Sequence, residues 1–404
     1  MESGTRARAA RLLVLGAGPA QLGLLEAARA RGLWLAVVDR DPPAPRFRFA
    51  DRRCILSTVD EPAIERLVPA LEIDGIVSPG TDWPVGVAAR IAERAGLPHP
   101  IAPATATLAT NKLRQRERLA EAGIPQPRWW VVGNGDEPPR FPGPVVVKAP
   151  DRQGQKGLSL VERSDELAGA IERARSAARN GAALVEELVD GPEVTVIGVS
   201  AGGAFTALAV TDRVVADPPA YGVALAHVWP SEAADVATLS ATVSRALGAL
   251  GVEHGPSYTQ LRIGPEGPKV IEVAARLGGG HDAELVEAAT GVDLNGLAID
   301  AAVGDELVLS QHKVGVGGAV TRFLVAPPGV LDHVDVPENL PGVRRVRIYR
   351  EPGYVFAPLR RGSDRAGAVL ATGDSRAEAL ARADAAADRI RFVTADAGRL
   401  SEAI

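Results

Sequence analysis

The stretch Ser257–Glu284, with the sequence SYTQLRIGPEGPKVIEVAARLGGGHDAE, decides the fold of this chain. Two β-rich runs flank a Gly-Pro-Glu-Gly turn, which is typical of a β-hairpin. If the strands pair symmetrically about Glu266, Gln260 and Glu272 lie opposite each other, because side chains alternate with a period of two. Arg276 and a glycine loop follow. This combination of carboxylate, cation and close backbone approach suits a magnesium phosphate; the alternative is a solvent-facing hairpin with ordinary charges.

The composition indicates a globular protein without a general affinity for polyanions. A chain of 404 residues exceeds one compact core and suggests roughly two to four domains. The net charge of −5 provides no attraction to nucleic acid or to an anionic membrane. The single cysteine, Cys54, excludes an intrachain disulfide and fits a reducing compartment. We find no signal-peptide core and no run of about 18 apolar residues, so we expect a cytoplasmic protein.

The N-terminal part alternates short apolar strands with helical patterns. A strand at Arg11–Leu15 leads into the turn Gly16–Gly18, then a helix, then a second strand that ends at Asp39. This is a β-α-β unit of the kind found in Rossmann-like domains. A dinucleotide fingerprint has a third glycine where Gln21 stands. We therefore expect a Rossmann-like domain without a dinucleotide, with a nicotinamide oxidoreductase as an alternative.

Lysine is scarce, and its positions are informative. Five of the 45 basic residues are lysines, and three of these are Lys112, Lys148 and Lys156. A chain that uses arginine for surface charge can keep lysine where a compact point charge is needed, as at a phosphate. Lys112 lies near the start of a predicted helix, where the helix dipole also favours an anion. Lys148 ends an apolar strand. For Lys112 the alternative is a surface lysine on an amphipathic helix.

The loop Asp151–Ser159 follows that strand and combines glycines with polar side chains. Gly154 and Gly157 supply flexibility, and Lys156 and Ser159 lie beside them. Such a loop can wrap a phosphate through backbone N–H groups. It does not match the P-loop pattern. A mobile glycine loop without a ligand is the alternative.

Acidic residues near strand ends form a further candidate site. Glu186 is followed by Glu187 and Leu188, and Glu193 begins the next strand. Such carboxylates can accept the two hydroxyls of a ribose while the neighbouring backbone contacts adenine. Solvated surface charges are the alternative.

The candidates for a substrate pocket are scattered along the second half of the chain. A loop rich in proline and glycine at 216–230 has the composition of a substrate-facing loop. Arg322 lies in a predicted strand, where it either holds a carboxylate or is an ordinary strand arginine. The candidate pocket residues are Tyr221, His227, Arg276, Gly279, His281 and Arg322.

Taken in order, these pieces resemble the ATP-grasp superfamily, specifically its carboxylate–amine ligases, over nearly the whole length. The motifs that carry the resemblance are NKL at 111–113, GIP at 123–125, VVK at 146–148, EEL at 186–188 and EVAARLGGG at 272–280. The resemblance implies an α/β chain that is α+β overall. Its expected parts are a Rossmann-like domain at 1–102, an ATP-grasp domain at 103–310 with a mobile lid at about 144–210, and a small α+β domain at 311–404.

The resemblance also implies roles for the residues in these motifs. Lys112 and Lys148 would hold the ATP phosphates, and the Gly154–Ser159 loop would cap them. The segment Glu186–Leu188 would form the adenine hinge, and Glu193 would bind the ribose.

The metal site would lie on the hairpin. Glu272 would bind Mg²⁺, with Mn²⁺ as an alternative, and Gln260 would lie beside the ion. Arg276 would stabilise the transferred phosphoryl group or the substrate carboxylate. The family usually has a second acidic residue where Gln260 stands and asparagine where Ala274 stands. Mg²⁺ keeps several waters and uses ATP oxygens, so such a site tolerates the loss, whereas a second metal ion is less well supported.

The function that the resemblance implies is ATP-dependent amide-bond formation. A carboxylate is a poor acyl donor because oxide is a poor leaving group, so ATP converts it to an acyl phosphate that an amine attacks, with release of ADP. The expected partners are a small carboxylic or amino acid and an amine; homodimers are common in the family. A carboxylase that uses bicarbonate and a nucleotide-binding protein without turnover are the alternatives.

Overall fold

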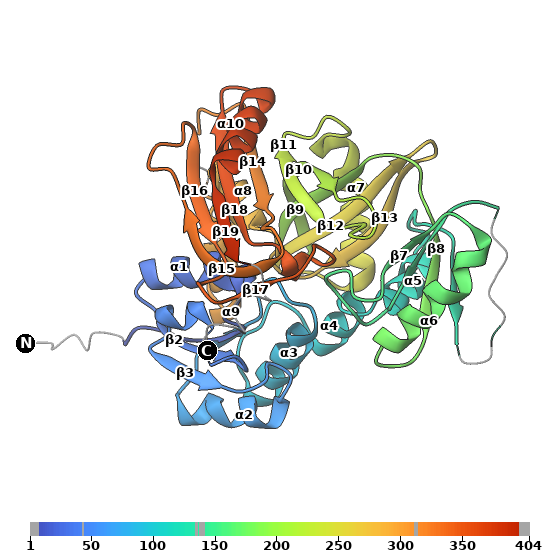
Figure 1. Ribbon diagram of the computed structural model, residues 1–404. Coiled ribbons are helices and arrows are strands. Elements are labelled where there is room, and N and C mark those ends of the chain that lie inside the picture. Colours follow the sequence, from blue (N-terminus) through green and yellow to red (C-terminus); the bar gives the residue numbers. More distant parts are fainter. Residues whose placement is uncertain (1–7, 43, 134–135, 137–141, 311–313, 396–404) are drawn as a thin grey trace, which may run out of the picture.

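The computed structural model describes residues 8–42, 44–133, 136, 142–310 and 314–395. Within this part of the chain the strands form four sheets. Figure 1 shows the N-terminal sheet at the bottom, a small sheet with its helix to one side, and the yellow-to-red strands of the second half of the chain above. No helix in the described ranges is long and apolar enough to cross a membrane.

The first sheet is parallel, in the order β3-β2-β1-β4. The side chains from Leu12 to Leu15 are fully buried, as a parallel sheet covered by helices requires. Its strands are β1 (Arg11–Leu15), β2 (Trp34–Asp39), β3 (Arg52–Ile55) and β4 (Gly75–Val77). The helices of this part are α1 (Leu22–Ala30), α2 (Glu61–Ala70), α3 (Trp83–Ala95) and α4 (Pro103–Ala109). This confirms the expected α/β alternation.

Side chains of the protein occupy the turn Gly16–Gly18 that follows β1. The Gln21 side chain accepts a hydrogen bond from Gly18 N at 2.9 Å and donates one to Pro79 O at 2.6 Å. Asp39 accepts a hydrogen bond from Ala17 N at 2.8 Å. Gln21 is buried, and a Cβ on Gly16 would lie 2.8 Å from its amide carbon. The groups that would contact a dinucleotide are therefore used internally, which argues against the nicotinamide alternative.

A small antiparallel sheet follows, in the order β5-β8-β6-β7. Helix α6 packs its alanine and isoleucine face on this sheet and buries a compact apolar cluster. The elements are α5 (Lys112–Glu121), β5 (Trp129–Val132), β6 (Val145–Lys148), β7 (Ser159–Val161), α6 (Leu167–Ala177) and β8 (Ala183–Glu187). Figure 1 shows this unit projecting from one side of the molecule.

The largest sheet runs through the rest of the chain, in the order β13-β12-β9-β10-β11-β14-β18-β16. Its strands are β9 (Glu193–Ala201), β10 (Ala204–Val215), β11 (Ala224–Trp229), β12 (Gly255–Gly264), β13 (Gly267–Ala274), β14 (Gly318–Leu324), β16 (Val343–Ile348) and β18 (Gly367–Gly373). The helices are α7 (Val236–Leu250), α8 (Asp282–Thr290), α9 (Leu294–Val303) and α10 (Arg376–Arg389). Strands β15 (Gly329–Asp335), β17 (Val355–Phe356) and β19 (Arg391–Ala395) form a fourth sheet.

The strand pairing crosses the expected limits of the lid and of the C-terminal part, and the division into domains stays a prediction. The segment 144–210 divides between two sheets, because β6 to β8 belong to the small sheet and β9 to the large one. The strands expected in the C-terminal domain do not all lie in a separate sheet, because β14 pairs with β11 and so extends the large sheet. Strand patterns predict where strands occur, but the choice of pairing edge is made by long-range contacts.

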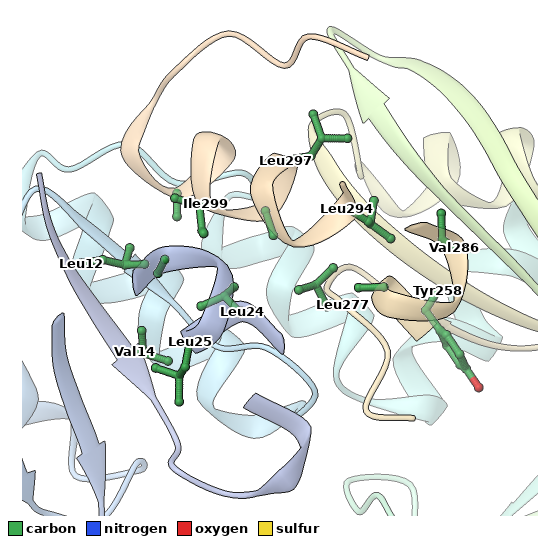
Figure 2. Packing of buried hydrophobic residues seen from close by; sticks show 14 of the residues in the cluster. Leu12, Val14, Leu24, Leu25, Tyr258, Leu277, Val286, Leu294, Leu297 and Ile299 are labelled. Atoms are coloured by element: carbon green, nitrogen blue, oxygen red, sulfur yellow. The ribbon is translucent and has the colours of Figure 1, made fainter. Parts of the chain in front are cut away.

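The first part of the chain packs directly on the large sheet. A buried cluster joins residues of β1 and α1 to residues of α8, α9 and β12. Figure 2 shows Leu12, Leu24 and Leu25 on one side of this cluster and Leu294 and Leu297 on the other. Tyr258 stands at its end, with its hydroxyl directed away from these leucines (Figure 2). This apolar packing therefore places the N-terminal sheet close to the hairpin of β12 and β13.

Candidate active site

The β12–β13 hairpin has the predicted register. Gln260 lies directly opposite Glu272, with a register shift immediately after Gln260. Gln260 donates its amide N–H to the Tyr258 hydroxyl at 3.0 Å. Its amide oxygen forms no hydrogen bond to any described residue, so the hairpin presents one carboxylate and one amide oxygen on the same face.

Lys112 lies against Glu272. The distance from Lys112 Nζ to Glu272 Oε1 is 3.0 Å, and Lys112 also donates to Arg152 O at 2.8 Å. Burial by itself lowers the pKa of Lys112, but Glu272 and Asp82 outweigh this and raise it above its ordinary value. Burial likewise would raise the pKa of Glu272, but Lys112, Lys148 and Arg276 hold it below the ordinary range. Both groups are therefore charged near neutral pH.

Lys148 belongs to a second, more deeply buried ion pair. Its ammonium lies 2.5 Å from Glu186 Oε2, and Arg116 Nε donates to Glu186 Oε1 at 2.8 Å. Arg116 also donates to Val270 O and Ile271 O of β13. Burial would raise the pKa of Glu186, but the two cations lower it to about 2. The Glu186 carboxylate is thus a structural counter-ion and is not free to bind a ribose.

The expected adenine hinge is held by hydrogen bonds on both sides. Glu187 accepts from Arg128 Nε at 2.6 Å, and Lys269 Nζ lies 3.2 Å from its other carboxylate oxygen. Leu188 N donates to Pro144 O at 3.0 Å. This segment therefore connects the small sheet to the hairpin.

The glycine loop closes against two distant parts of the chain. Gln153 accepts a hydrogen bond from Asp82 N, and Gln155 accepts one from Gly362 N at 3.2 Å. Gly157 has a φ of +72°, and a Cβ there would lie 2.7 Å from Ala177 Cβ. Ser159 begins β7, where its hydroxyl accepts from Arg173 at 3.3 Å.

Lys156 lies among cations. Burial lowers its pKa first, and four neighbouring arginines lower it further: Arg361, Arg152, Arg40 and Arg179. No carboxylate lies within 4 Å of its ammonium among the residues that the structure describes. This excess of positive charge at the loop favours a polyanion such as a nucleotide phosphate.

Arg276 is held by a residue that the sequence analysis did not identify. Its Nε donates to Asp82 Oδ1 at 2.8 Å, its Nη2 contacts the same oxygen, and its Nη1 donates to Leu277 O at 2.8 Å. Asp82 precedes α3, after the carboxyl end of β4. The position after a parallel strand, where ligand-contacting residues often lie, was the available signal for Asp82.

Glu193 and Tyr221 are both paired with arginines. Glu193 contacts Arg213, which also donates to Gly222 O at 3.1 Å. Tyr221 accepts from Arg262 at 3.3 Å, and burial raises its pKa. A ribose at Glu193 would therefore share that carboxylate with Arg213. Nothing in the sequence pattern marked Arg213.

The two histidines lie at the glycine loop after β13, where a Cβ on Gly280 would lie 2.6 Å from His227 Cε1. His227 Nδ1 lies 2.6 Å from Asp282 Oδ1, and its buried Nε2 has no partner among the described residues. His281, at a φ of 60°, has its Nε2 2.6 Å from the Tyr349 hydroxyl. A Cβ on Gly279 would lie 3.1 Å from Gly80 O, so this loop packs against the N-terminal part.

Arg322 does not lie with the other residues of the predicted pocket. Thr321 and Arg322 are adjacent in β14 and pair with His227 and Ala226, so Arg322 projects from the face opposite His227. Its Nε lies 3.1 Å from Asp384 of α10. Arg322 is therefore an ordinary strand arginine, which was the alternative left open.

The hairpin residues fit one Mg²⁺ ion bound together with a phosphate. No group of three or more histidine, cysteine, aspartate or glutamate side chains that could hold a metal occurs in the described part of the chain. Glu272 and the free amide oxygen of Gln260 supply two hard oxygen atoms on one face. Mg²⁺ sites that use nucleotide phosphates need only one or two protein carboxylates.

Comparison with known proteins places the chain in a superfamily. Residues 140–310 match the carbamoyl-phosphate synthase L chain ATP-binding domain, and residues 322–395 match the L-amino acid ligase C-terminal domain 2. The fold of nearly the whole chain is similar to that of solved ATP-grasp proteins. The chain belongs to the ATP-grasp superfamily.

Individual relatives and solved structures are similar to the chain over most of its length. The uncharacterized protein y4rH of Sinorhizobium fredii is 31% identical over 331 residues, which are 78% of this chain and 67% of y4rH. A formate-dependent phosphoribosylglycinamide formyltransferase of Thioalkalivibrio sulfidiphilus is 27% identical over 95% of this chain and 97% of its own. The crystal structure of the L-amino acid ligase from Bacillus licheniformis superposes with a TM-score of 0.81 at 20% identity, covering 96% of this chain and 100% of that chain.

Proposed function

We propose that this protein is an ATP-dependent ligase that activates a small carboxylic or amino acid as an acyl phosphate and joins it to an amine. ADP and phosphate are the other products. The observation that carries the proposal is the convergence of Glu272, Lys112 and Arg276 on one face of the hairpin, with Lys148 at its side. One carboxylate among several fixed cations suits phosphoryl transfer, which depends mainly on positioning and charge neutralisation.

In this proposal each residue of the site has a separate role. Lys112, Lys148 and Lys156 hold the phosphates of ATP, and Arg276, oriented by Asp82, neutralises the transferred phosphoryl group. Glu272 and Gln260 hold Mg²⁺, which supplies charge neutralisation at the phosphate oxygens when bound. A carboxylate oxygen of the acid attacks the γ-phosphorus and ADP leaves; the amine nitrogen then attacks the acyl carbon and phosphate leaves.

Exclusion of water is part of this function because an acyl phosphate hydrolyses readily. We propose the small sheet with its glycine loop as the lid, with residues 1–102, 103–310 and 311–404 as the working division of the chain. Gln153 and Gln155 hold the loop to Asp82 and Gly362. A closed loop at these contacts would cover the phosphates during the reaction.

Coupled ADP release tests the proposal. The enzyme is incubated with Mg-ATP and pairs of acids and amines, including amino acids, formate and bicarbonate. We expect ADP and phosphate release that needs both an acid and an amine and is lost in Glu272→Ala. The matched control is Glu266→Ala, which removes an exposed glutamate from the turn of the same hairpin and should leave the release unchanged.

Three results contradict this function. Release of AMP and pyrophosphate would exclude an acyl phosphate route. Release with bicarbonate and no organic acid would indicate a carboxylase. ATP binding without release across the whole panel would indicate a nucleotide-binding protein without turnover.

A further inference from the structure

Trp83 is a large aromatic side chain that has no role in the proposed reaction and is partly exposed. It is the first residue of α3, directly after Asp82, and its relative exposure is 40%. The guanidinium carbon of Arg179 lies 3.7 Å from the centre of its ring. Because an arginine stays protonated in proteins, this contact is a cation–π stack.

The stack joins two separate parts of the chain. Trp83 belongs to the N-terminal part, whereas Arg179 lies between α6 and β8 in the unit of the small sheet. A second contact lies one residue away, where Gln153 of the glycine loop accepts a hydrogen bond from Asp82 N. Two adjacent residues at the start of α3 therefore contact the unit that we propose as the lid.

Arg179 is also tied to the beginning of the glycine loop. Its backbone N–H donates to Asp151 Oδ1 at 3.0 Å, and its Nη1 donates to Asp151 O at 2.8 Å. The next residue, Arg152, accepts a hydrogen bond from Lys112 Nζ through its carbonyl oxygen at 2.8 Å. Arg179 therefore holds the base of the loop as well as the Trp83 ring.

The residue before Trp83 holds Arg276. The Asp82 carboxylate accepts from Arg276 Nε at 2.8 Å, while its backbone N–H donates to Gln153. The stack therefore lies one residue from the group that orients Arg276, at the edge where the glycine loop meets the N-terminal part.

We propose that the Trp83–Arg179 stack is a clamp that keeps the small-sheet unit closed while the acyl phosphate exists, so that this intermediate reacts with the amine and not with water. This inference rests on the proposed ligase function. In the competing reaction a water oxygen bonds to the acyl carbon while the C–O bond to phosphate breaks. Phosphate leaves with the electron pair and takes up a proton from the water. The acid is regenerated, and one ATP is hydrolysed without an amide bond.

The test measures ADP release in excess of amide formation, with an acid–amine pair that the wild type accepts. Trp83→Leu removes the ring and keeps an apolar side chain. An exposed cation–π contact changes an equilibrium about two- to fivefold, so we expect the excess of ADP per amide to rise by about that factor. Arg179→Gln should raise it at least as much, and the double variant should equal Arg179→Gln, because both substitutions remove one shared contact.

Two further variants distinguish the clamp from a structural role. Trp83→Phe keeps an aromatic face and should stay close to the wild type. Tyr354→Leu is the matched control, because Tyr354 is 39% exposed and stacks on Arg350 at 4.4 Å within the C-terminal part. It should keep the wild-type ratio. A role of Trp83 in folding alone would reduce the amount of active enzyme and leave the ratio of ADP to amide unchanged.

The dissociation rate of a fluorescent ADP analogue, measured by a chase with ADP, is a second readout that needs no turnover. We expect it to rise about two- to fivefold in Trp83→Leu and Arg179→Gln, and to stay unchanged in Tyr354→Leu. A higher ADP-to-amide ratio with an unchanged dissociation rate would show that the stack does not hold the lid, and would overturn the clamp.

The outcomes separate this inference from the ligase function. Without ADP release from any acid–amine pair in the wild type, the ligase function is wrong and the clamp falls with it. Coupled release in the wild type, with an unchanged ratio in Trp83→Leu and Arg179→Gln, would overturn only the clamp. An equal rise in Tyr354→Leu would also overturn it, because the effect would then follow from the loss of any exposed aromatic ring.

Discussion

At the scale of single residues, Glu186 shows how a buried carboxylate is used for structure. It lies between Arg116 and Lys148, and all three side chains are buried. Arg116 carries this contact on to β13 through two carbonyl oxygens. The charge network therefore links α5, the small sheet and the hairpin, and fixes Lys148 at the end of β6.

Glu186 makes stability depend on pH. Its pKa is about 2 in the folded protein and 4.5 in the ordinary reference state, so its contribution is fully present above about pH 4.5 and is lost as the pH falls toward 2. The difference corresponds to about 3 kcal/mol. Urea unfolding at a series of pH values should show this fall, and Glu186→Gln should flatten it. The slope that remains comes from the other carboxylates whose pKa values are lowered in the folded protein, among them Glu284, at about 2, and Glu272.

Glu186→Gln should also destabilise the protein at neutral pH by about 3 to 5 kcal/mol, because it leaves two buried cations uncompensated. Asp165→Asn is the control, since the pair of Asp165 with Arg163 is exposed, and it should leave the unfolding free energy unchanged. An unchanged acid slope in Glu186→Gln would show that this carboxylate does not titrate in the way described.

At the scale of elements, the start of α5 sets the position of Lys112. The Asn111 side chain accepts hydrogen bonds from Leu113 N at 3.0 Å and Arg114 N at 3.2 Å. Lys112 is the first residue of the helix, and its own N–H donates to Pro150 O. The cap therefore positions a candidate phosphate ligand as well as a helix.

Asn111→Ala should lower the unfolding free energy by about 1 kcal/mol, the usual cost of losing an N-cap side chain. It should also raise the KM for ATP, because the first turn that carries Lys112 loosens. Ser375→Ala removes the equivalent cap of α10, where Ser375 accepts from Glu378 N. We expect a similar loss of stability there with an unchanged KM. If the two variants had equal KM values for ATP, the Asn111 cap would have no role in nucleotide binding.

The glycine loop depends on Gly157 more than on Gly154. Both have positive φ, but a Cβ at Gly154 meets nothing within 4 Å, whereas a Cβ at Gly157 would lie 2.7 Å from Ala177 Cβ of α6. Gly157→Ala should weaken ATP binding by about tenfold more than Gly154→Ala, equal to about 1.4 kcal/mol for the added clash. Equilibrium titration with ATP measures both constants, and equal affinities would show that the loop shifts without cost.

At the scale of the whole molecule, the site is assembled from parts that are distant in sequence. Asp82 of the N-terminal part holds Arg276, Gly80 packs against Gly279, and Gly362 of the C-terminal part contacts the glycine loop. The apolar cluster between the N-terminal sheet and the large sheet keeps these contacts in place (Figure 2).

Asp82→Asn should reduce the rate of ADP release by about 100-fold, because a misplaced Arg276 no longer meets the transferred phosphoryl group. ATP affinity should change much less, since the lysines are untouched. Asp300→Asn is the matched control, because Asp300 pairs with Arg31 at 2.7 Å between the same two parts but away from the site. A similar rate loss in both variants would indicate that the change acts through the packing of the two parts.

The sequence alone predicted many of the strands and helices and the candidate residues for phosphate binding. The hairpin register and the helix with Lys112 near its start follow from local alternation and capping. The roles assigned to Lys112, Lys148 and Glu272 remain predictions. Asp82, which holds Arg276, and Arg116, which pairs with Glu186, were missed, because they become neighbours of the site only through long-range packing.

The sequence by itself determined the local structure: which segments are strands or helices, and that Gln260 faces Glu272, because backbone periodicity and turn chemistry act over a few residues. Tertiary structure decided the rest. It made Glu186 a buried counter-ion, turned Arg322 away from the pocket and joined Asp82 to Arg276. Charge pairing and burial depend on which edges and faces meet across hundreds of residues, and no local pattern encodes that choice.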